Sequence, residues 1–255
     1  MRAPPSGGRQ RRARAIAGRT DRTWWLALAS AAAFLFIDAP AKAQVAGSIS
    51  IDSDYRLRGY SLSGRRPVAT LDLSYDHDSG VYVNAAATTV LTDKDHVDLL
   101  AVEGSIGYAR RITKGLSVDG GVSRSQYPVG FARYRRAHYT EIYLGLTSDR
   151  ISSHIYYSPD YLRPGVSTLY GEIDALFFRI EKVNFSGHIG LLETIALPAG
   201  SRPRELQHDW RIGASRQFGP FELHAALTGG GPGADYYDGA PHSRTAVTAG
   251  ASWFF

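Results

Sequence analysis

The chain has 255 residues, of which 44% are hydrophobic, and its 29 Lys and Arg against 24 Asp and Glu give a formal net charge of +5. It contains no cysteine, which excludes a disulfide framework and a thiolate metal site. This length allows one large β domain or two small ones, and no internal stretch reaches the roughly 18 apolar residues of a membrane-spanning helix.

The first 43 residues predict a cleaved secretory signal peptide. An arginine-rich start precedes the apolar run Trp24–Ile37, and Ala41-Lys42-Ala43 then supplies a small-residue cleavage pattern before Gln44. This segment carries 8 of the 29 basic and 2 of the 24 acidic residues, so the mature chain 44–255 keeps 21 basic and 22 acidic groups, a net charge of −1. The basic excess leaves with the signal peptide, and nucleic acid is therefore not an expected partner.

After Gln44 the chain predicts strands, with no helical period of convincing length. About twelve segments of ten to fifteen residues alternate with a period of two. A tilted strand needs roughly 9–11 residues to cross a bilayer, whereas most strands of soluble proteins have about 5–6. The lengths therefore favour a membrane barrel. The expected strands are 45–59, 67–77, 80–92, 97–110, 115–126, 137–148, 151–160, 167–180, 183–196, 207–217, 220–229 and 243–255.

The connections between these segments alternate between tight and long, which is typical of outer-membrane barrels with short periplasmic turns and longer outer loops. An even number of strands then leaves both termini on the periplasmic side. The expected tight turns are 77–80, 111–114, 149–150, 181–182 and 218–220. The expected longer connections are 60–66, 126–136, 161–166, 197–206 and 229–242, with 92–96 as a short member of this second set.

One set of alternate positions is apolar, as at Ile49, Leu71, Leu100 and Ile142, and the other set is polar. A soluble barrel buries its apolar residues inside, so polar-inward and apolar-outward faces predict a barrel surrounded by lipid. Arg124 breaks the outward pattern and is expected to meet lipid phosphates near the outer rim. The candidates for lining the lumen and for selectivity are Asp52, Asp54, Arg56, Arg58, Asp72, Glu103, Asp119, Glu141, Tyr156, Asp160, Glu172, Asp174, His188, Arg211 and Glu222.

The last segment, Ser243–Phe255, alternates in the same way and finishes on Trp253, Phe254 and Phe255. The last strand of an outer-membrane barrel pairs with the first, and its outward aromatics lie at the lipid–water boundary. We therefore expect this segment to close the barrel. Its partners are expected to be the barrel assembly machinery, which would bind the strand ending at Phe255, and the lipid and lipopolysaccharide of the outer membrane.

Four stretches carry a resemblance to a known family: Ser53–Ser63 (S-D-Y-R-L-R-G-Y-S-L-S), Leu73–Val81, His138–Gly145 and Tyr156–Tyr161 (Y-Y-S-P-D-Y). The first resembles the opening signature of the TorF-like outer-membrane porins, a bacterial family of unknown function of the Gcw_chp type. The resemblance covers about residues 45–255 and implies an outer-membrane β-barrel of porin type. It implies no substrate and no catalytic residues.

Asp52, Asp54, Arg56 and Arg58 are spaced two apart, which places all four on one face of the expected first strand. Two interpretations stay open for them. They form a charged constriction that selects solutes by charge, or a ladder of cross-strand ion pairs that stiffens the wall.

The segment Tyr156–Tyr161 ends a strand at Pro159, and Asp160 there either caps the following loop or faces the lumen. Tyrosines in this segment line a solute path or serve packing and interfacial roles. His154, His188 and His224 are expected to face inward near Ser, Asp and Glu, the residue types of a hydrolase or a metal site. No motif places a serine beside a histidine as in outer-membrane phospholipases, and no short-spaced ligand pattern is present. The sequence therefore favours neither site.

The sequence as a whole predicts an all-β protein, a single antiparallel transmembrane barrel of about 12 strands in the outer membrane of a Gram-negative bacterium. The expected function is passive passage of small polar solutes, with a cation preference, no cofactor and no enzymatic activity. One alternative is a structural, adhesion or receptor barrel that transports nothing. The other is an outer-membrane barrel hydrolase.

Overall fold

The computed structural model describes residues 43–92, 96–128, 137–201, 206–232 and 245–255. The expected signal peptide lies outside the described residues. The described residues all belong to one compact unit. The described part of the chain contains no helix with the length and hydrophobicity needed to span a bilayer.

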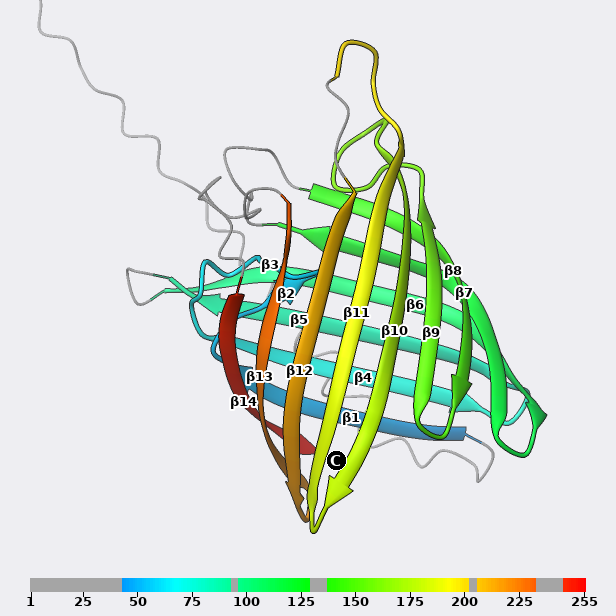
Figure 1. Ribbon diagram of the computed structural model, residues 1–255, viewed down its shortest axis with the longest axis vertical. Helices are drawn as coiled ribbons and strands as arrows, with labels where there is room; N and C mark the ends of the chain where they lie inside the picture. Colours follow the sequence, from blue (N-terminus) through cyan, green and yellow to red (C-terminus); the bar gives the residue numbers. More distant parts are fainter. Residues whose placement is uncertain (1–42, 93–95, 129–136, 202–205, 233–244) are drawn as a thin grey trace, which may run out of the picture. The chain divides into compact units, whose positions relative to one another are not determined.

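The described chain forms a closed barrel of twelve antiparallel strands, which confirms the predicted fold class (Figure 1). Each strand pairs with its sequence neighbour around the wall. The barrel strands in chain order are β1 (Ala43–Asp52), β4 (Val68–His77), β5 (Val81–Leu91), β6 (Val97–Thr113), β7 (Leu116–Tyr127), β8 (Ala137–Ser148), β9 (Ile151–Ser158), β10 (Ser167–Ile180), β11 (Val183–Ala196), β12 (Gln207–Phe218), β13 (Phe221–Gly231) and β14 (Thr245–Phe254).

The barrel closes where the sequence predicts it, between the first strand and the last. β14 lies antiparallel to β1, with Ser48 opposite Phe254 and Asp52 opposite Gly250. Gly47 and Phe255 exchange backbone N–H···O hydrogen bonds of 2.9 Å in both directions. Closure satisfies the backbone groups that an open sheet leaves unpaired at its edges.

The connections define two different ends of the barrel. Five connections have two or three residues, 78–80, 114–115, 149–150, 181–182 and 219–220, and they lie at one end, which we call the turn end. The other connections join their strands at the opposite end, which we call the loop end. Each of them is at least five residues long. This alternation is as predicted.

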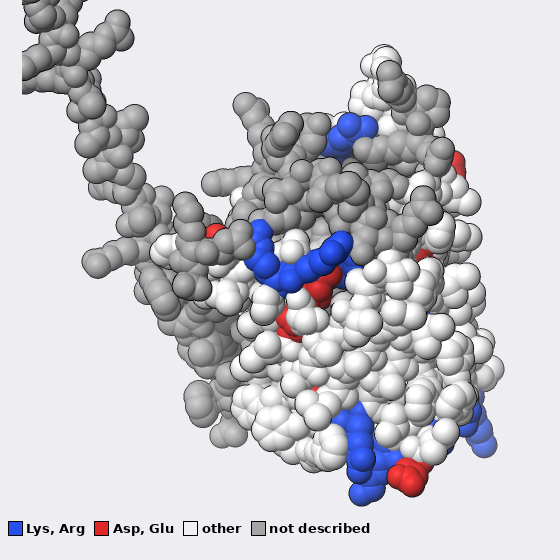
Figure 2. Space-filling model, turned by 60° about the vertical axis from the view of Figure 1, so that its left-hand side comes forward, with Lys and Arg blue, Asp and Glu red and all other residues white. Residues whose placement is uncertain are grey.

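The outer wall is apolar and exposed. Ile49, Leu71 and Trp253 stand side by side in the register of β4, β1 and β14, and Ile142 in β8 is 58% exposed. On the face seen in Figure 2, Lys, Arg, Asp and Glu gather toward the two ends, with a largely uncharged wall between them. Arg124 is exposed among the outward positions of β7, as expected, and its guanidinium donates to Thr140 Oγ1 at 2.8 Å.

The expected outward position of Leu100 is wrong. The side chain is fully buried, because β6 carries a bulge at this residue: Thr88 pairs with Ala101 and the next residue, Thr89, pairs with Leu99. An extra residue in one strand shifts the alternation, so the side chains beyond it point to the opposite face of the sheet. Leu100 therefore joins a buried cluster at the loop end that also contains Val90, Tyr127 and Leu192.

The expected first strand, 45–59, is also wrong beyond Asp52, where β1 ends. Arg56 lies in a separate short strand, β2 (Arg56–Leu57), which pairs with β3 (Tyr60–Ser61). Arg58 and Gly59 connect these two strands with φ angles of +49° and +81°. Positive φ at both central residues is the signature of a type I′ turn, which reverses the chain. The four charged residues therefore do not share one strand face.

Candidate functional site

The connection Ser53–Pro67, which we call the lumen hairpin, folds into the barrel and contains β2 and β3 (Figure 1). Tyr60, Leu62 and Ser63 in this segment are buried. A segment exposed to solvent outside the barrel would not bury these side chains. The first four residues of the expected outer loop 60–66 are thus part of the interior, whereas Gly64 and Arg65 are exposed.

The lumen hairpin contacts widely separated parts of the wall. At its start, Tyr55 Oη donates to Glu103 Oε2 on β6 at 2.9 Å. At its tip, a Cβ on Gly59 would lie 2.8 Å from the Asp209 Cβ of β12 and 2.9 Å from the Gly229 carbonyl oxygen of β13. Only glycine allows this approach together with the positive φ. The hairpin therefore spans the lumen from β6 to β12 and β13.

Arg58 anchors the turn of the hairpin to a third part of the wall. Its Nη2 lies 2.7 Å from Glu141 Oε1 on β8, and the two side chains are only 8% and 6% exposed. The guanidinium carbon also lies 3.9 Å from the ring centroid of Tyr170 and 4.8 Å from that of Tyr161. A desolvated cation over aromatic faces adds attraction to the ion pair. Arg58 thus has a structural role in holding the hairpin.

Asp54 organises the hairpin from within. Its Oδ1 accepts hydrogen bonds from Ser61 Oγ at 2.6 Å and Ser63 Oγ at 2.8 Å. Its Oδ2 lies 3.5 Å from Nε of Arg56. The carboxylate therefore joins the two arms of the hairpin and sits beside the Arg56 guanidinium.

Glu103 receives two hydroxyl donors, Tyr55 from the hairpin and Ser125 from β7, the latter at 3.1 Å. Burial raises the pKa of the Tyr55 phenol well above its ordinary value, and the charge of Glu103 raises that pKa further. The phenol therefore stays protonated and donates to the carboxylate.

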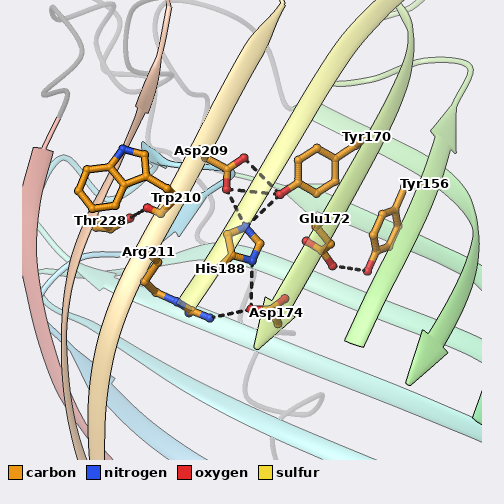
Figure 3. Close-up of polar contacts among 9 residues, drawn as sticks. All are labelled: Tyr156, Tyr170, Glu172, Asp174, His188, Asp209, Trp210, Arg211 and Thr228. Carbon is orange, nitrogen blue, oxygen red and sulfur yellow. Dashed lines mark hydrogen bonds and ion pairs between the residues drawn. The ribbon is translucent and has the colours of Figure 1, made fainter. Parts of the chain in front are cut away.

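A network of polar side chains lines the part of the wall that is formed by β10, β11 and β12 (Figure 3). His188 Nδ1 lies 3.0 Å from Asp174 Oδ1, and its Nε2 lies 2.8 Å from Asp209 Oδ1. Tyr170 Oη donates to Asp209 Oδ2 at 3.2 Å, and Arg211 donates to Asp174 at 3.3 Å. Both nitrogens of the imidazole thus face carboxylates, which fixes the ring against the wall.

Glu172 lies beside this network and accepts a 2.9 Å hydrogen bond from Tyr156 Oη (Figure 3). The ligand atoms of Glu172, Asp174 and His188 lie within 4.8 Å of one another, so this is a group of the type that holds a metal ion. His188 already contacts two carboxylates, and Arg211 approaches Asp174. A cation at this place would compete with those contacts.

The three inward histidines each pair with an acid. His154 Nε2 lies 3.5 Å from Asp119 Oδ1, and His224 Nε2 lies 2.7 Å from Asp52 Oδ1. For the part of the chain that the structure describes, no hydrogen bond joins a serine hydroxyl to His154, His188 or His224. In the described part of the chain, the partners of these three imidazoles are carboxylates and the Tyr170 hydroxyl.

The hairpin and the wall together line an open cavity of about 750 Å³. Ten of the predicted lumen candidates line it: Arg56, Arg58, Asp72, Glu103, Glu141, Tyr156, Glu172, Asp174, His188 and Arg211. Eight of them lie on barrel strands, at polar positions of the alternation. Arg56 and Arg58 belong to the hairpin and do not continue the first strand, as the sequence had suggested.

The other five candidates lie outside the lining of this cavity. Asp52 and Asp119 pair with histidines, and Asp54 is buried within the hairpin. Glu222 lies in β13 near the turn end. Asp160 is exposed and accepts a 2.9 Å hydrogen bond from the backbone N–H of Gly165, so it caps the loop after β9.

Tyr170 and Asp209 line the cavity, but the sequence does not single them out. Both occupy polar positions of the two-residue alternation, and this alternation is the sequence pattern that could have identified them as inward-facing. Their importance comes from partners that are distant in sequence, namely Arg58 for Tyr170 and Gly59 for Asp209.

The barrel is similar to a solved porin and to solved outer-membrane proteins at low sequence identity. The KdgM porin is 11% identical, with 82% of this chain and 99% of that chain covered and a TM-score of 0.48. OmpT of Vibrio cholerae in its trimer form is 10% identical, with 84% and 99% covered and a TM-score of 0.42. The channel DcaP of Acinetobacter baumannii is 10% identical, with 85% and 99% covered and a TM-score of 0.41.

No curated protein matches this sequence. A family of bacterial proteins does match it, over residues 38–254, which include all twelve strands of the barrel. The match also contains the lumen hairpin and every residue of the cavity lining. The chain therefore belongs to the bacterial protein family of unknown function Gcw_chp.

Proposed function

We propose that this chain is an outer-membrane channel through which small polar solutes diffuse passively, with the lumen hairpin as its constriction. The observation that carries the proposal is the polar cavity of about 750 Å³ inside a barrel whose outer wall is apolar. Charged side chains and a hairpin anchored to several strands narrow this space. A pore lined by such groups selects solutes by size and charge.

The proposed location is the outer membrane of a Gram-negative bacterium, after export by the signal peptide 1–43. The exposed apolar wall and the aromatic end of β14, with Trp253 and Phe255 rings 5.0 Å apart, support contact with lipid. Lipopolysaccharide and the barrel assembly machinery are the proposed partners. The resemblance to the TorF-like porins is consistent with this location.

Membrane insertion is tested on the outer wall. Ile142→Arg places a charge near the middle of β8 on an exposed apolar face, and we expect it to reduce folding stability in lipid by about 2–4 kcal/mol. Urea titration of the barrel in liposomes, followed by its heat-modifiable gel mobility, measures the change. Ile142→Leu is the control with no expected loss. An arginine variant as stable as the parent would contradict burial of this face in lipid.

The charge of the lining predicts a preference for cations. Six carboxylates and three guanidinium groups line the cavity, the acids being Asp72, Glu103, Glu141, Glu172, Asp174 and Asp209. This excess of negative charge raises the local concentration of cations. In a potassium chloride gradient across a planar bilayer, the reversal potential is expected to have the sign of a cation-selective pore. A clear anion preference would contradict this charge assignment.

The channel itself is tested by conductance. Purified protein added to a planar bilayer is expected to give discrete current steps. A barrel that gives no steps would support the alternative of a structural, adhesion or receptor protein. One observation favours that alternative: Leu62 and Tyr161 from two connections, together with Tyr127 from β7, fill the loop end with buried side chains. We expect no enzymatic activity.

A further inference from the structure

Arg56 is a buried cation whose hydrogen-bonding capacity is largely unused. Its side chain is 7% exposed, and its Nη1 and Nη2 have no hydrogen-bond partner among the described residues. Its ion-pair contact is Nε to Asp54 Oδ2 at 3.5 Å. A guanidinium carries five N–H donors, and burying charged donors without acceptors is costly. A group placed this way is suited to an acceptor that arrives from outside the chain.

The hairpin holds this guanidinium in a defined position. Ser61 and Ser63 fix Asp54, and Asp54 occupies the Nε side of Arg56. Arg56 also stands opposite Ser61 in the pairing of β2 with β3. Arg56 lines the cavity, and its Nη1 and Nη2 atoms are themselves buried. The planar pair of donors matches the two oxygens of a carboxylate.

Three carboxylates that line the same cavity have no cationic partner in the described part of the chain. Glu103 accepts from Tyr55 and Ser125, and Glu172 accepts from Tyr156. Asp72 accepts only a long hydrogen bond of 3.5 Å from Ser48 Oγ. Carboxylates that receive only hydroxyl donors keep acceptor capacity and their full negative charge.

This combination of charges restricts the solutes that fit. A simple anion gains the contact with Arg56 but meets the excess of carboxylates. A simple cation gains the carboxylates but leaves the donors of Arg56 unpaired. A molecule that carries one group of each sign satisfies both sides of the cavity. We propose that the cavity binds a small zwitterion of the amino-acid class, with its carboxylate on Arg56 and its ammonium group toward the carboxylates of the lining that have no cationic partner.

This assignment deepens the proposed channel function by naming its solute class, and it is tested without conductance. The full chain, folded in detergent micelles, is dialysed to equilibrium against radiolabelled glycine, with acetate and methylammonium as competitors. These two ions each carry one half of the glycine charge pattern. We expect saturable glycine binding that neither ion displaces as well as unlabelled glycine does.

Substitutions assign the binding to the proposed groups. Arg56→Gln is expected to weaken glycine binding about tenfold or more, because a charge-assisted bidentate contact is lost. Arg56→Lys keeps the charge but not the paired donors, and an intermediate loss is expected. Glu172→Gln keeps an acceptor for Tyr156 and removes the charge, so it also weakens binding. Arg150→Gln in the tight turn after β8 is the control and leaves binding unchanged.

The outcomes separate this inference from the channel function. A protein that conducts ions but shows no saturable glycine binding refutes the zwitterion site and leaves the channel standing. Displacement by acetate as effective as by glycine, with no effect of methylammonium or of Glu172→Gln, would make the cavity an anion site instead. Heat-modifiable mobility confirms that each variant is folded. If Arg56→Gln does not fold, Arg56→Lys and Glu172→Gln decide the question.

Discussion

Replacing the lumen hairpin by a tight turn is expected to raise the single-channel conductance several-fold. Asp52 and Val68 are direct partners in the pairing of β1 with β4, so an Asn-Gly turn in place of residues 53–67 closes the two strands without distorting them. The substitution removes the segment that spans the lumen between β6 and β12. Because a pore of wider cross-section carries more current, the current steps in a planar bilayer become larger. The selectivity for cations falls, because the constriction formed by the hairpin is lost.

The control is a matched exchange at the other end of the barrel. Replacing Asp149-Arg150, the two-residue turn between β8 and β9, by Asn-Gly is expected to leave the conductance unchanged. Unaltered steps in the hairpin variant would mean that this segment does not limit the current. Large steps that appear only after its removal, from a parent that shows none, would identify the native protein as a plugged barrel.

The second large effect is expected from Glu141→Ala. The substitution leaves Arg58 buried without its 2.7 Å partner, and breaking a buried ion pair in this way costs about 3–5 kcal/mol. We expect the hairpin to detach from the wall before the barrel itself unfolds, because the pair joins the turn of the hairpin to β8 and does not join two barrel strands. Trypsin cleavage after Arg56 or Arg58 in the folded barrel and a larger conductance would report the detachment.

Two comparisons make this prediction specific. Arg211→Gln breaks an ion pair with Asp174 whose side chains are 54% and 37% exposed, and a loss below about 1 kcal/mol is expected there. The double variant Arg58→Leu with Glu141→Leu removes both buried charges and should lose less stability than Glu141→Ala alone. Equal trypsin sensitivity in Glu141→Ala and Arg211→Gln would refute the anchoring role of Arg58.

The wall of the barrel was predictable because the alternation of residue types that produces it lies within each strand and repeats from strand to strand. Each strand alternates between a face that meets an apolar environment and a face that meets a polar one, so neighbouring residues such as Leu71 and Asp72 already differ in type. The tight turns between strands are equally local. The sequence therefore determined the number of strands, their order around the barrel and the side of the wall on which most residues lie.

The two wrong predictions for the wall concern places where the periodicity of the sequence does not determine the conformation. The run Asp52–Arg58 alternates as well as any strand, yet the chain leaves the sheet after Asp52. Leu100 fits the outward pattern, but a bulge buries it. In both places the conformation depends on contacts with other strands, which an alternation of residue types does not encode.

Only the tertiary structure decided the candidate site. Arg58 and Glu141 are separated by 83 positions in the chain, and the hairpin tip meets β12 and β13 from much further along the sequence. These partners surround the hairpin only after the twelve strands have closed into a barrel. The sequence by itself thus specified an apolar wall around a polar interior, because that pattern follows from each strand alone. The segment that occupies the interior, and the buried guanidinium that it places there, follow from contacts across the closed lumen.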